Sequence, residues 1–280
     1  MHAPEVLRST AFADGPGGGN PAGVVLDATG LDDAAMLAVA TEVGYAETVF
    51  VTAVDCDRIT VRYFSPGAEV PFCGHATVAL AVAVAEREGP GERVFVTAAG
   101  DVPVVATTAE DGTVLVTMTS VEPDVRPIDP VVLGGLLTLL GLVPDDLDPD
   151  HPALEASAGN RNPVLVLRDA ELFHQFRFAP TLLAPFMRAQ GWLGTVTVLR
   201  VVGPLEFEAR NLFPVGRISE DPATGSAAAA VGAYLRSIGR AHAGDRVVIR
   251  QGRHVGRPSV LLVDVPATGG IRVTGGATPV

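Results

Sequence analysis

Apolar positions along the chain recur with the period of a strand in some segments and with that of a helix in others. Five segments combine β-branched residues with apolar–polar alternation, which is typical of strands. They are residues 47–52, 59–64, 94–97, 102–107 and 114–118. Residues 31–43 follow a helical period instead and predict an amphipathic helix. Its inner face is expected to carry Leu31, Ala35, Ala38 and Val39.

Two further segments are rich in alanine, valine and leucine and carry few charges, residues 75–87 and 226–236. A helix that is apolar on nearly every side is a buried helix. One such helix falls in each half of the chain. The pattern therefore predicts a mixed α/β (α+β) fold in which a sheet wraps around a central buried helix, once in each half.

An internal repeat divides the chain into two lobes. The sequence EVPFCGHA at 69–76 is echoed by EDPATGSA at 220–227, where glutamate, proline, glycine and alanine match in register. Residues 91–94 are echoed by 244–247, and the Asn-Pro pair at 20–21 by that at 162–163. We expect residues 1–120, joined by a C-terminal strand at 268–280, to form the N-terminal lobe and residues 121–267 the C-terminal lobe. The joint is predicted in the proline-rich stretch 120–130.

The charge balance narrows the possible functions. The 280-residue chain carries 32 acidic and 20 basic residues, a formal net charge of −12. Binding to nucleic acid or to an anionic membrane surface needs a basic face, so neither partner is expected. All the basic residues are arginine, and without lysine the chain cannot form a Schiff base or hold a phosphate with a Walker-type lysine.

Cysteine and histidine usage gives no sign of a bound group. Cys56 and Cys73 are too few for a disulfide framework, and no Cys/His spacing typical of zinc is present. The first 13 residues contain no apolar run long enough for a signal peptide, and no charge-free apolar run could span a bilayer. We therefore expect a soluble, cytoplasmic protein without cofactor or metal.

The repeated motif has a physical meaning at the start of each buried helix. Gly74 and Gly225 fall where a strand–loop segment passes into the helix, and glycine there permits close approach of a ligand and unusual backbone dihedral angles. The first helical N–H groups, at the positive end of the helix dipole, could then hold a carboxylate. The alternative is that Gly-x-Ala only allows tight packing of helix on sheet. Because the motif occurs twice, we favour a carboxylate site between two helix starts.

The motifs resemble the signature blocks of the PhzF family of phenazine biosynthesis. The matching segments, in family order, are GNPAGVV (19–25), AETVFV (46–51), RYFSP (62–66), PFCGHAT (71–77), EDPATGSA (220–227) and QGRHVGRPS (251–259). The resemblance covers nearly the whole chain. It implies the diaminopimelate-epimerase-like fold, with two pseudo-symmetric lobes, an active site between them and a homodimer.

The resemblance also assigns roles to individual residues. Glu47 matches the family's catalytic glutamate, His75 its histidine beside the substrate, and Asp221 an aspartate that holds polar groups of the substrate. Glu47 opens an apolar strand, and a carboxylate partly removed from water becomes a stronger base. The alternatives are a solvated strand-end glutamate at Glu47, packing or capping by His75, and an Asp-Pro turn at Asp221.

A second set of residues is expected to bind the substrate. Ser226, with the backbone of Gly74 and Gly225, forms the expected carboxylate cradle, and Gln251 is carried over as a substrate-binding amide.

Cys73 also lies in this expected site. The related epimerases use one thiol per lobe, but the position equivalent to Cys73 in the second lobe is Thr224, whose hydroxyl is a far weaker acid than a thiol. Two-thiol racemisation is therefore not expected, and Cys73 is interpreted as a small packed residue beside the site.

Three functions remain open from the sequence. The leading hypothesis is a cofactor-independent proton shift on a small carboxylate such as trans-2,3-dihydro-3-hydroxyanthranilate, with Glu47 as the base. The second is an amino-acid epimerase in which Cys73 and Glu47 act as an opposed pair; full activity of a Cys73→Ser variant would exclude it. The third is a protein that binds a small carboxylate without turnover.

Overall fold

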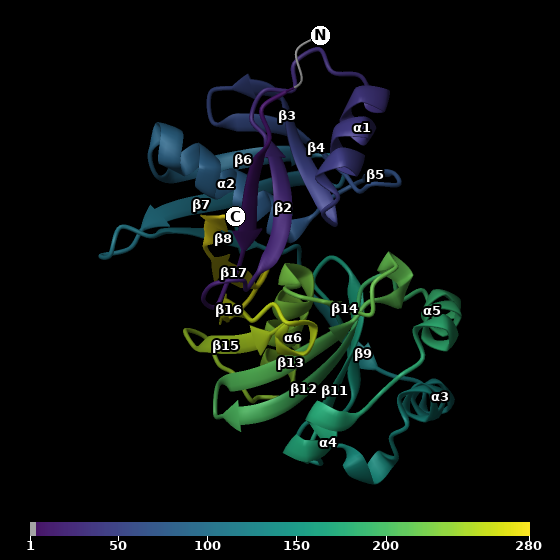
Figure 1. The fold of residues 1–280 in the computed structure, drawn as a ribbon. Coiled ribbons are helices and arrows are strands. Elements are labelled where there is room, and N and C mark those ends of the chain that lie inside the picture. Colours follow the sequence, from purple (N-terminus) through teal and green to yellow (C-terminus); the bar gives the residue numbers. More distant parts are fainter. Residues whose placement is uncertain (1–3) are drawn as a thin grey trace. The chain divides into compact units, whose positions relative to one another are not determined.

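The structure is a computed structural model that describes residues 4–280. The chain divides into two compact units, and each is treated separately below (Figure 1). Unit 1 runs to Thr119 and includes Thr274–Val280, whereas unit 2 is Ser120–Val273. No helix within residues 4–280 is both long enough and apolar enough to cross a membrane.

Unit 1 contains a mixed sheet with the strand order β18-β1-β2-β3-β4-β6-β7-β8. Its strands are β1 (Leu7–Ala11), β2 (Asn20–Val25), β3 (Glu47–Asp55), β4 (Arg58–Phe64), β5 (Glu69–Val70), β6 (Gly91–Thr97), β7 (Gly100–Thr108), β8 (Val114–Thr119) and β18 (Ala277–Pro279). The pairs β2–β3 and β4–β6 are parallel and the others antiparallel, and β5 is a short partner of β4. The five predicted strands are all present and extend by one to three residues at some ends.

The helix α2 (Gly74–Glu88) is the centre of unit 1. Its residues from His75 to Ala85 are all buried, as the apolar pattern predicted, and it packs against strands on several sides. The first turn of α2 is held by Tyr63 of β4, whose hydroxyl shares a 2.7 Å hydrogen bond with Thr77. Thr77 in turn donates to the carbonyl of Cys73 at 2.7 Å. The start of α2 is therefore fixed to the sheet by a buried chain of hydrogen bonds.

The helix α1 (Asp33–Val43) begins two residues later than predicted. Asp32 is its N-cap, and the carboxylate accepts a hydrogen bond from the Ala35 amide at 2.8 Å. The predicted inner face was right only in part, because α1 fully buries Met36, Ala40 and Val43, and of the predicted residues Leu31 and Val39 pack against the same cluster partly buried. These positions also repeat at helical spacing, and burying methionine and valine removes more apolar surface than burying Ala38, which stays exposed.

Unit 2 repeats the same strand order as β9-β10-β11-β12-β13-β15-β16. The strands are β9 (Asp124–Pro127), β10 (Leu154–Ser157), β11 (Arg161–Leu167), β12 (Val196–Gly203), β13 (Glu206–Leu212), β14 (Glu220–Asp221), β15 (Arg246–Gln251) and β16 (Ser259–Asp264), and β17 (Arg272–Gly275) spans the boundary with unit 1. The pairs β11–β12 and β13–β15 are parallel, and β14 is a short partner of β13. The seven strands of this sheet therefore correspond, in order, to the seven strands from β18 to β7 in unit 1.

The buried helix of unit 2 is α6 (Gly225–Ser237), the counterpart of α2. Unit 2 also has three helices, α3 (Pro130–Leu140), α4 (Ala170–Gln175) and α5 (Pro180–Ala189), and short 3-10 turns at Pro144–Asp146, Pro214–Gly216 and Arg253–Val255. A second apolar cluster around Trp192 and Phe173 packs α3, α4 and α5 together. The fold is thus mixed α/β with one central helix per unit, as predicted.

Candidate active site

Glu47, Cys73 and His75 converge at the start of α2 in unit 1. Glu47 is the first residue of β3, Cys73 is the N-cap of α2, and His75 is the second residue of the helix. The Cys73 thiol lies 3.5 Å from Glu47 Oε2 and 3.3 Å from His75 Nδ1. His75 Nε2 lies 3.4 Å from the same Glu47 oxygen. A carboxylate, a thiol and an imidazole therefore lie close enough for a proton to pass directly from one to another.

This cluster is largely removed from water. Cys73 and His75 are buried, and the Glu47 side chain is 21% exposed. Cys73 does not cap the helix with its side chain. The thiol instead contacts Glu47 and His75, so Cys73 does more than fill space beside the site.

A second set of predicted residues gathers at the start of α6 in unit 2. Thr224 is the N-cap of α6, and its hydroxyl donates to Asp221 Oδ2 at 2.5 Å. The Gln251 amide donates to the carbonyl of Asp221 at 2.6 Å and to the Thr224 hydroxyl at 3.0 Å, and it accepts from the Thr224 amide at 3.2 Å. Gln251 therefore orients Asp221 and Thr224.

Gly252 brings the backbone after Gln251 close to this set. Its φ is +81°, and a Cβ at this position would lie 2.2 Å from the Arg257 carbonyl oxygen and 2.6 Å from the Pro222 carbonyl oxygen. Only glycine satisfies both the left-handed conformation and this close approach. The turn that follows β15 is thus pressed against the backbone next to Asp221.

The two predicted glycines begin helices in ordinary conformations. Gly74 and Gly225 are the first residues of α2 and α6, and neither has a positive φ. A Cβ at Gly74 would meet only ordinary van der Waals contacts. The expectation of unusual dihedral angles at these positions was therefore wrong, because each glycine is already the first residue of its helix and the residue before it is extended. Ser226, the second residue of α6, is half-buried.

Strand registers show which residues of the two units are equivalent. Phe64 in β4 pairs with Glu69 in β5, and Leu212 in β13 pairs with Glu220 in β14. Phe64 and Leu212 are therefore equivalent, as are Glu69 and Glu220. The helix N-caps Cys73 and Thr224 occupy equivalent positions by the same comparison, as do His75 and Ser226.

The equivalent of Glu47 in unit 2 is Thr195. Glu47 immediately precedes the residue that pairs with Phe64, and Thr195 immediately precedes the residue that pairs with Leu212. Thr195 is buried, and its hydroxyl donates to the side-chain oxygen of Asn211 at 3.0 Å. The three ionisable side chains of unit 1 thus correspond to hydroxyl groups in unit 2.

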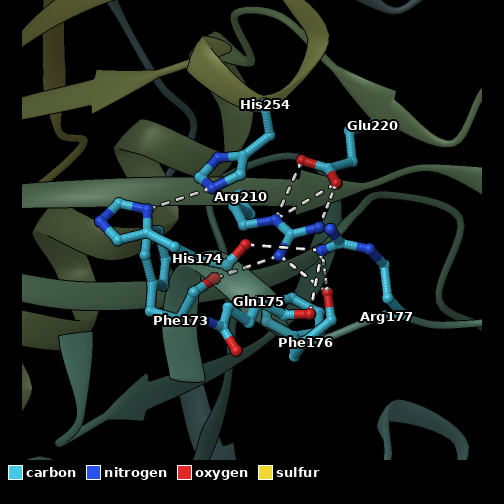
Figure 2. Close-up of polar contacts among 8 residues, drawn as sticks. All are labelled: Phe173, His174, Gln175, Phe176, Arg177, Arg210, Glu220 and His254. Atoms are coloured by element: carbon cyan, nitrogen blue, oxygen red, sulfur yellow. Dashed lines mark hydrogen bonds and ion pairs between the residues drawn. The ribbon is translucent and has the colours of Figure 1, made fainter. Parts of the chain in front are cut away.

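A buried ion pair holds β14 against β13 (Figure 2). The side chains of Arg210 and Glu220 are 4% and 9% exposed, and the closest N–O distance is 2.6 Å. The Arg210 guanidinium also donates to the carbonyl oxygens of Phe173 and Phe176 at 3.1 Å and stacks over the Phe176 ring at 3.8 Å. Because Glu220 precedes Asp221, this pair positions the aspartate.

The equivalent pair in unit 1 is Arg62 and Glu69, and it is exposed to water. The guanidinium bonds both carboxylate oxygens at 2.7 and 2.6 Å, while the side chains are 28% and 37% exposed. Hydrogen bonding from Arg62 lowers the pKa of Glu69. Asp33 of α1 makes a further 2.7 Å contact with Arg62.

Two histidines lie beside the buried pair. His174 and His254 stack with ring centroids 5.3 Å apart, and Nδ1 of the first lies 3.2 Å from Nε2 of the second (Figure 2). Burial, and then the positive charge of Arg210, lower the pKa of His254. His174 also pairs with Glu208, whose Oε2 lies 3.6 Å from His174 Nε2.

The arginine of each pair was missed from the sequence. The repeat matched Glu69 with Glu220 but did not extend back to Arg62 and Arg210, which precede them at slightly different distances. The available signal was the shared order of an arginine, one further residue, a phenylalanine or leucine, and then, after a turn, a glutamate. Insertion of residues in the turn before Glu220 hid it.

Comparison with known proteins places the whole chain in one family. The model of the phenazine biosynthesis-like protein family, PhzC-PhzF, matches residues 9–280. The uncharacterized isomerase YfhB of Bacillus subtilis is 30% identical over 291 residues, with 99% of this chain and 97% of the relative covered.

Solved structures agree with this family. The Bacillus anthracis phenazine biosynthesis protein of the PhzF family superposes with a TM-score of 0.87 at 26% identity, covering 100% of this chain and 98% of its own. A predicted epimerase of Pseudomonas aeruginosa, PA4716, gives a TM-score of 0.85 at 30% identity over 98% and 96% of the two chains. This chain therefore belongs to the phenazine biosynthesis-like, PhzC-PhzF, family.

Proposed function

We propose that this chain, an isomerase by its family and relatives, shifts a proton on a small carboxylate with Glu47 as the base. The observation that supports it most directly is the convergence of Glu47, Cys73 and His75 within 3.3–3.8 Å at the start of α2. A general base must be held in a defined position against the proton that it abstracts, and the contacts with Cys73 and His75 hold the Glu47 carboxylate in place.

The proposed reaction conserves every atom of the substrate. Glu47 removes a proton from carbon, and the electron pair of the broken C–H bond moves into the adjoining π system. The protonated Glu47 then returns the proton to another carbon of the same molecule. His75 stabilises the charge that develops and orients the Glu47 carboxyl group, because Nε2 lies 3.4 Å from its oxygen.

Unit 2 is proposed to supply binding groups in this reaction. The Asp221 carboxylate accepts a hydrogen bond from the Thr224 hydroxyl, which fixes its orientation within unit 2. Ser226 and the backbone of Gly74 and Gly225 lie in the first turns of α2 and α6, where the helix dipole favours a carboxylate. Gln251 contributes by fixing Asp221.

The family name makes trans-2,3-dihydro-3-hydroxyanthranilate the first compound to test. Wild type, Glu47→Gln and a control, Glu42→Gln, would each be incubated with it in D₂O and followed by NMR. Glu42 lies on the exposed surface of α1, so its amide variant should match wild type. We expect conversion or carbon deuteration by wild type and the control, and a loss of about 10²–10⁴-fold in Glu47→Gln. Unimpaired turnover by Glu47→Gln would refute the proposal for Glu47.

A second candidate function is epimerisation of an amino acid by Cys73 and Glu47. It is favoured by the similarity to PA4716, a predicted epimerase, although the 3.5 Å contact of the thiol with the carboxylate leaves no space for a substrate carbon between the two groups. Incubation of amino acids with wild type and Cys73→Ser in D₂O distinguishes the two functions. Loss of α-carbon deuteration in Cys73→Ser would support epimerisation, whereas retention would assign the proton transfer to Glu47 alone.

A further inference from the structure

We propose that Glu47, Cys73 and His75 also form a zinc site with three protein ligands and an open fourth position. Within residues 4–280 this is the one group of three or more such side chains whose ligand atoms all lie within 4.8 Å of one another. Metal binding does not rest on the proposed function, but the inhibition it would cause does.

The distances fit tetrahedral zinc. Glu47 Oε2 lies 3.5 Å from Cys73 Sγ and 3.4 Å from His75 Nε2, and the sulfur lies 3.8 Å from the same nitrogen. With Zn–S of about 2.3 Å and Zn–N and Zn–O of about 2.0–2.1 Å, tetrahedral ligand atoms are about 3.3–3.6 Å apart. The three side chains therefore need to move by only a few tenths of an ångström to bind the ion.

The donor atoms select the kind of metal. A thiolate and an imidazole favour zinc over magnesium or calcium, which prefer oxygen ligands. Three protein ligands with one open position are the pattern of reactive zinc sites. Binding requires Cys73 to release its thiol proton to solvent, since the thiolate is the ligand.

Sequence spacing could not reveal this site. Cys73 and His75 are neighbours on α2, but Glu47 reaches them from β3, and only the fold brings the three together. No motif with fixed ligand spacing exists in the chain for them to match.

Unit 2 provides an internal comparison. The equivalents of the three ligands are Thr195, Thr224 and Ser226, which offer only hydroxyl groups. Neutral hydroxyls are poor zinc ligands. We therefore expect a single strong site per chain, located in unit 1.

Zinc at this position would block the proposed reaction. The ion would occupy the Glu47 oxygen that is to take the substrate proton, and the Cys73 and His75 atoms beside it. Inhibition should then be competitive with substrate and reversed by a chelator.

The test uses cobalt as an optical substitute for zinc. The full chain carrying Cys56→Ser, which removes the exposed second thiol, is stripped with a chelator and titrated with Co²⁺ without oxygen. We expect a thiolate-to-cobalt charge-transfer band that saturates at one ion per chain and disappears when zinc is added. The band should be absent in the double variant that carries Cys73→Ser as well as Cys56→Ser. Glu47→Gln and His75→Gln should each weaken zinc binding by more than the ~10–100-fold that loss of an outer-shell partner costs.

The same experiment can overturn the proposal. A band that persists after Cys73→Ser, or zinc affinity unchanged in both Glu47→Gln and His75→Gln, would show that the ion binds elsewhere. Absence of any saturable binding of Co²⁺ or Zn²⁺ would exclude the site. Because binding is read from absorption and stoichiometry, these outcomes are independent of whether the proton shift occurs.

Discussion

The two units share one strand order but carry different chemistry at the start of the central helix. Unit 1 places Glu47, Cys73 and His75 there, whereas unit 2 places hydroxyl groups at the equivalent positions together with Asp221. The duplicated fold provides two similar helix starts, and the side chains placed there give each start different chemical groups. The function proposed above assigns proton transfer to unit 1 and the fixed hydrogen-bonding groups to unit 2.

The ion pairs beside these helix starts differ in the same way. Arg210–Glu220 in unit 2 is buried, and Arg62–Glu69 in unit 1 is open to water. An exposed pair contributes little because water screens it, but a buried pair cannot lose one partner without leaving an unpaired charge. The comparison of the units therefore makes quantitative predictions.

The largest difference is expected from removing each arginine. Arg210→Met should lower the free energy of unfolding by about 3–5 kcal/mol, since Glu220 would remain buried and unpaired. Arg62→Met should cost about 0.2–1 kcal/mol. Urea denaturation of both variants measures the difference, and the double variant Arg210→Met/Glu220→Leu should recover part of the loss. Equal costs for the two single variants would contradict the contrast between the pairs.

A smaller effect is expected at the glycine that supports Asp221. Gly252→Ala should destabilise the protein by about 2–4 kcal/mol, because alanine adds a strained left-handed residue and a clash with two carbonyl oxygens. Gly256→Ala is the matched control, since Gly256 also has a positive φ but no atom within 4 Å of a Cβ, and it should cost about 1–2 kcal/mol. Thermal unfolding of both variants would reveal whether the close approach matters.

Replacing Cys73 by its unit 2 counterpart should change the activity only modestly. If Glu47 is the base, Cys73→Thr should retain proton exchange within about tenfold of wild type, a loss of about 1.4 kcal/mol at most. The rate of deuterium uptake gives this value directly. A loss as large as that of Glu47→Gln would instead make the thiol part of the chemistry.

The smallest effect is expected from pH. The pKa of His254 is lowered from 6.5 in the folded protein, so the unfolded chain binds the proton more readily. The stability contribution of the neutral histidine is present above pH 6.5 and is lost as the pH falls through 6.5 toward the folded value. Among the neighbouring groups, the pKa of His254 is lowered by Arg210 and His174 and raised by Glu220 and Glu208.

Stability measured against pH for His254→Gln should therefore decline less steeply below pH 6.5 than that of wild type. His242→Gln, at an exposed position, serves as the control and should follow wild type. An unchanged slope in His254→Gln would contradict the prediction.

Much of the architecture was predictable because its signals are local. The alternation at 47–52 and the uniform apolar composition at 75–87 depend only on neighbouring residues, and β3 and α2 follow them. The inner face of α1 could not be predicted in the same way, because several faces of that helix are apolar and tertiary packing decides which of them is buried. The sulfur contacts of Cys73 depend on where β3 and α2 meet, which the sequence does not show.

The internal repeat was informative but misleading in one place. The Asn-Pro pairs at 20–21 and 162–163 suggested equivalent residues. The strand registers place Ala22 opposite Glu47 and Val164 opposite Thr197, two residues after the equivalent of Glu47. The two Asn-Pro pairs are thus displaced by two residues, a shift that keeps side chains on the same face of the sheet and is invisible to pattern matching.

The most direct test of Glu47 as the base is incorporation of deuterium from D₂O into trans-2,3-dihydro-3-hydroxyanthranilate, with Glu47→Gln compared to Thr195→Ser. Glu47→Gln should lose about 10²–10⁴-fold in the rate of carbon deuteration. Thr195→Ser, at the equivalent position in unit 2, keeps its hydroxyl and should exchange at the wild-type rate. Deuteration at the wild-type rate in Glu47→Gln would contradict the assignment of Glu47 as the base.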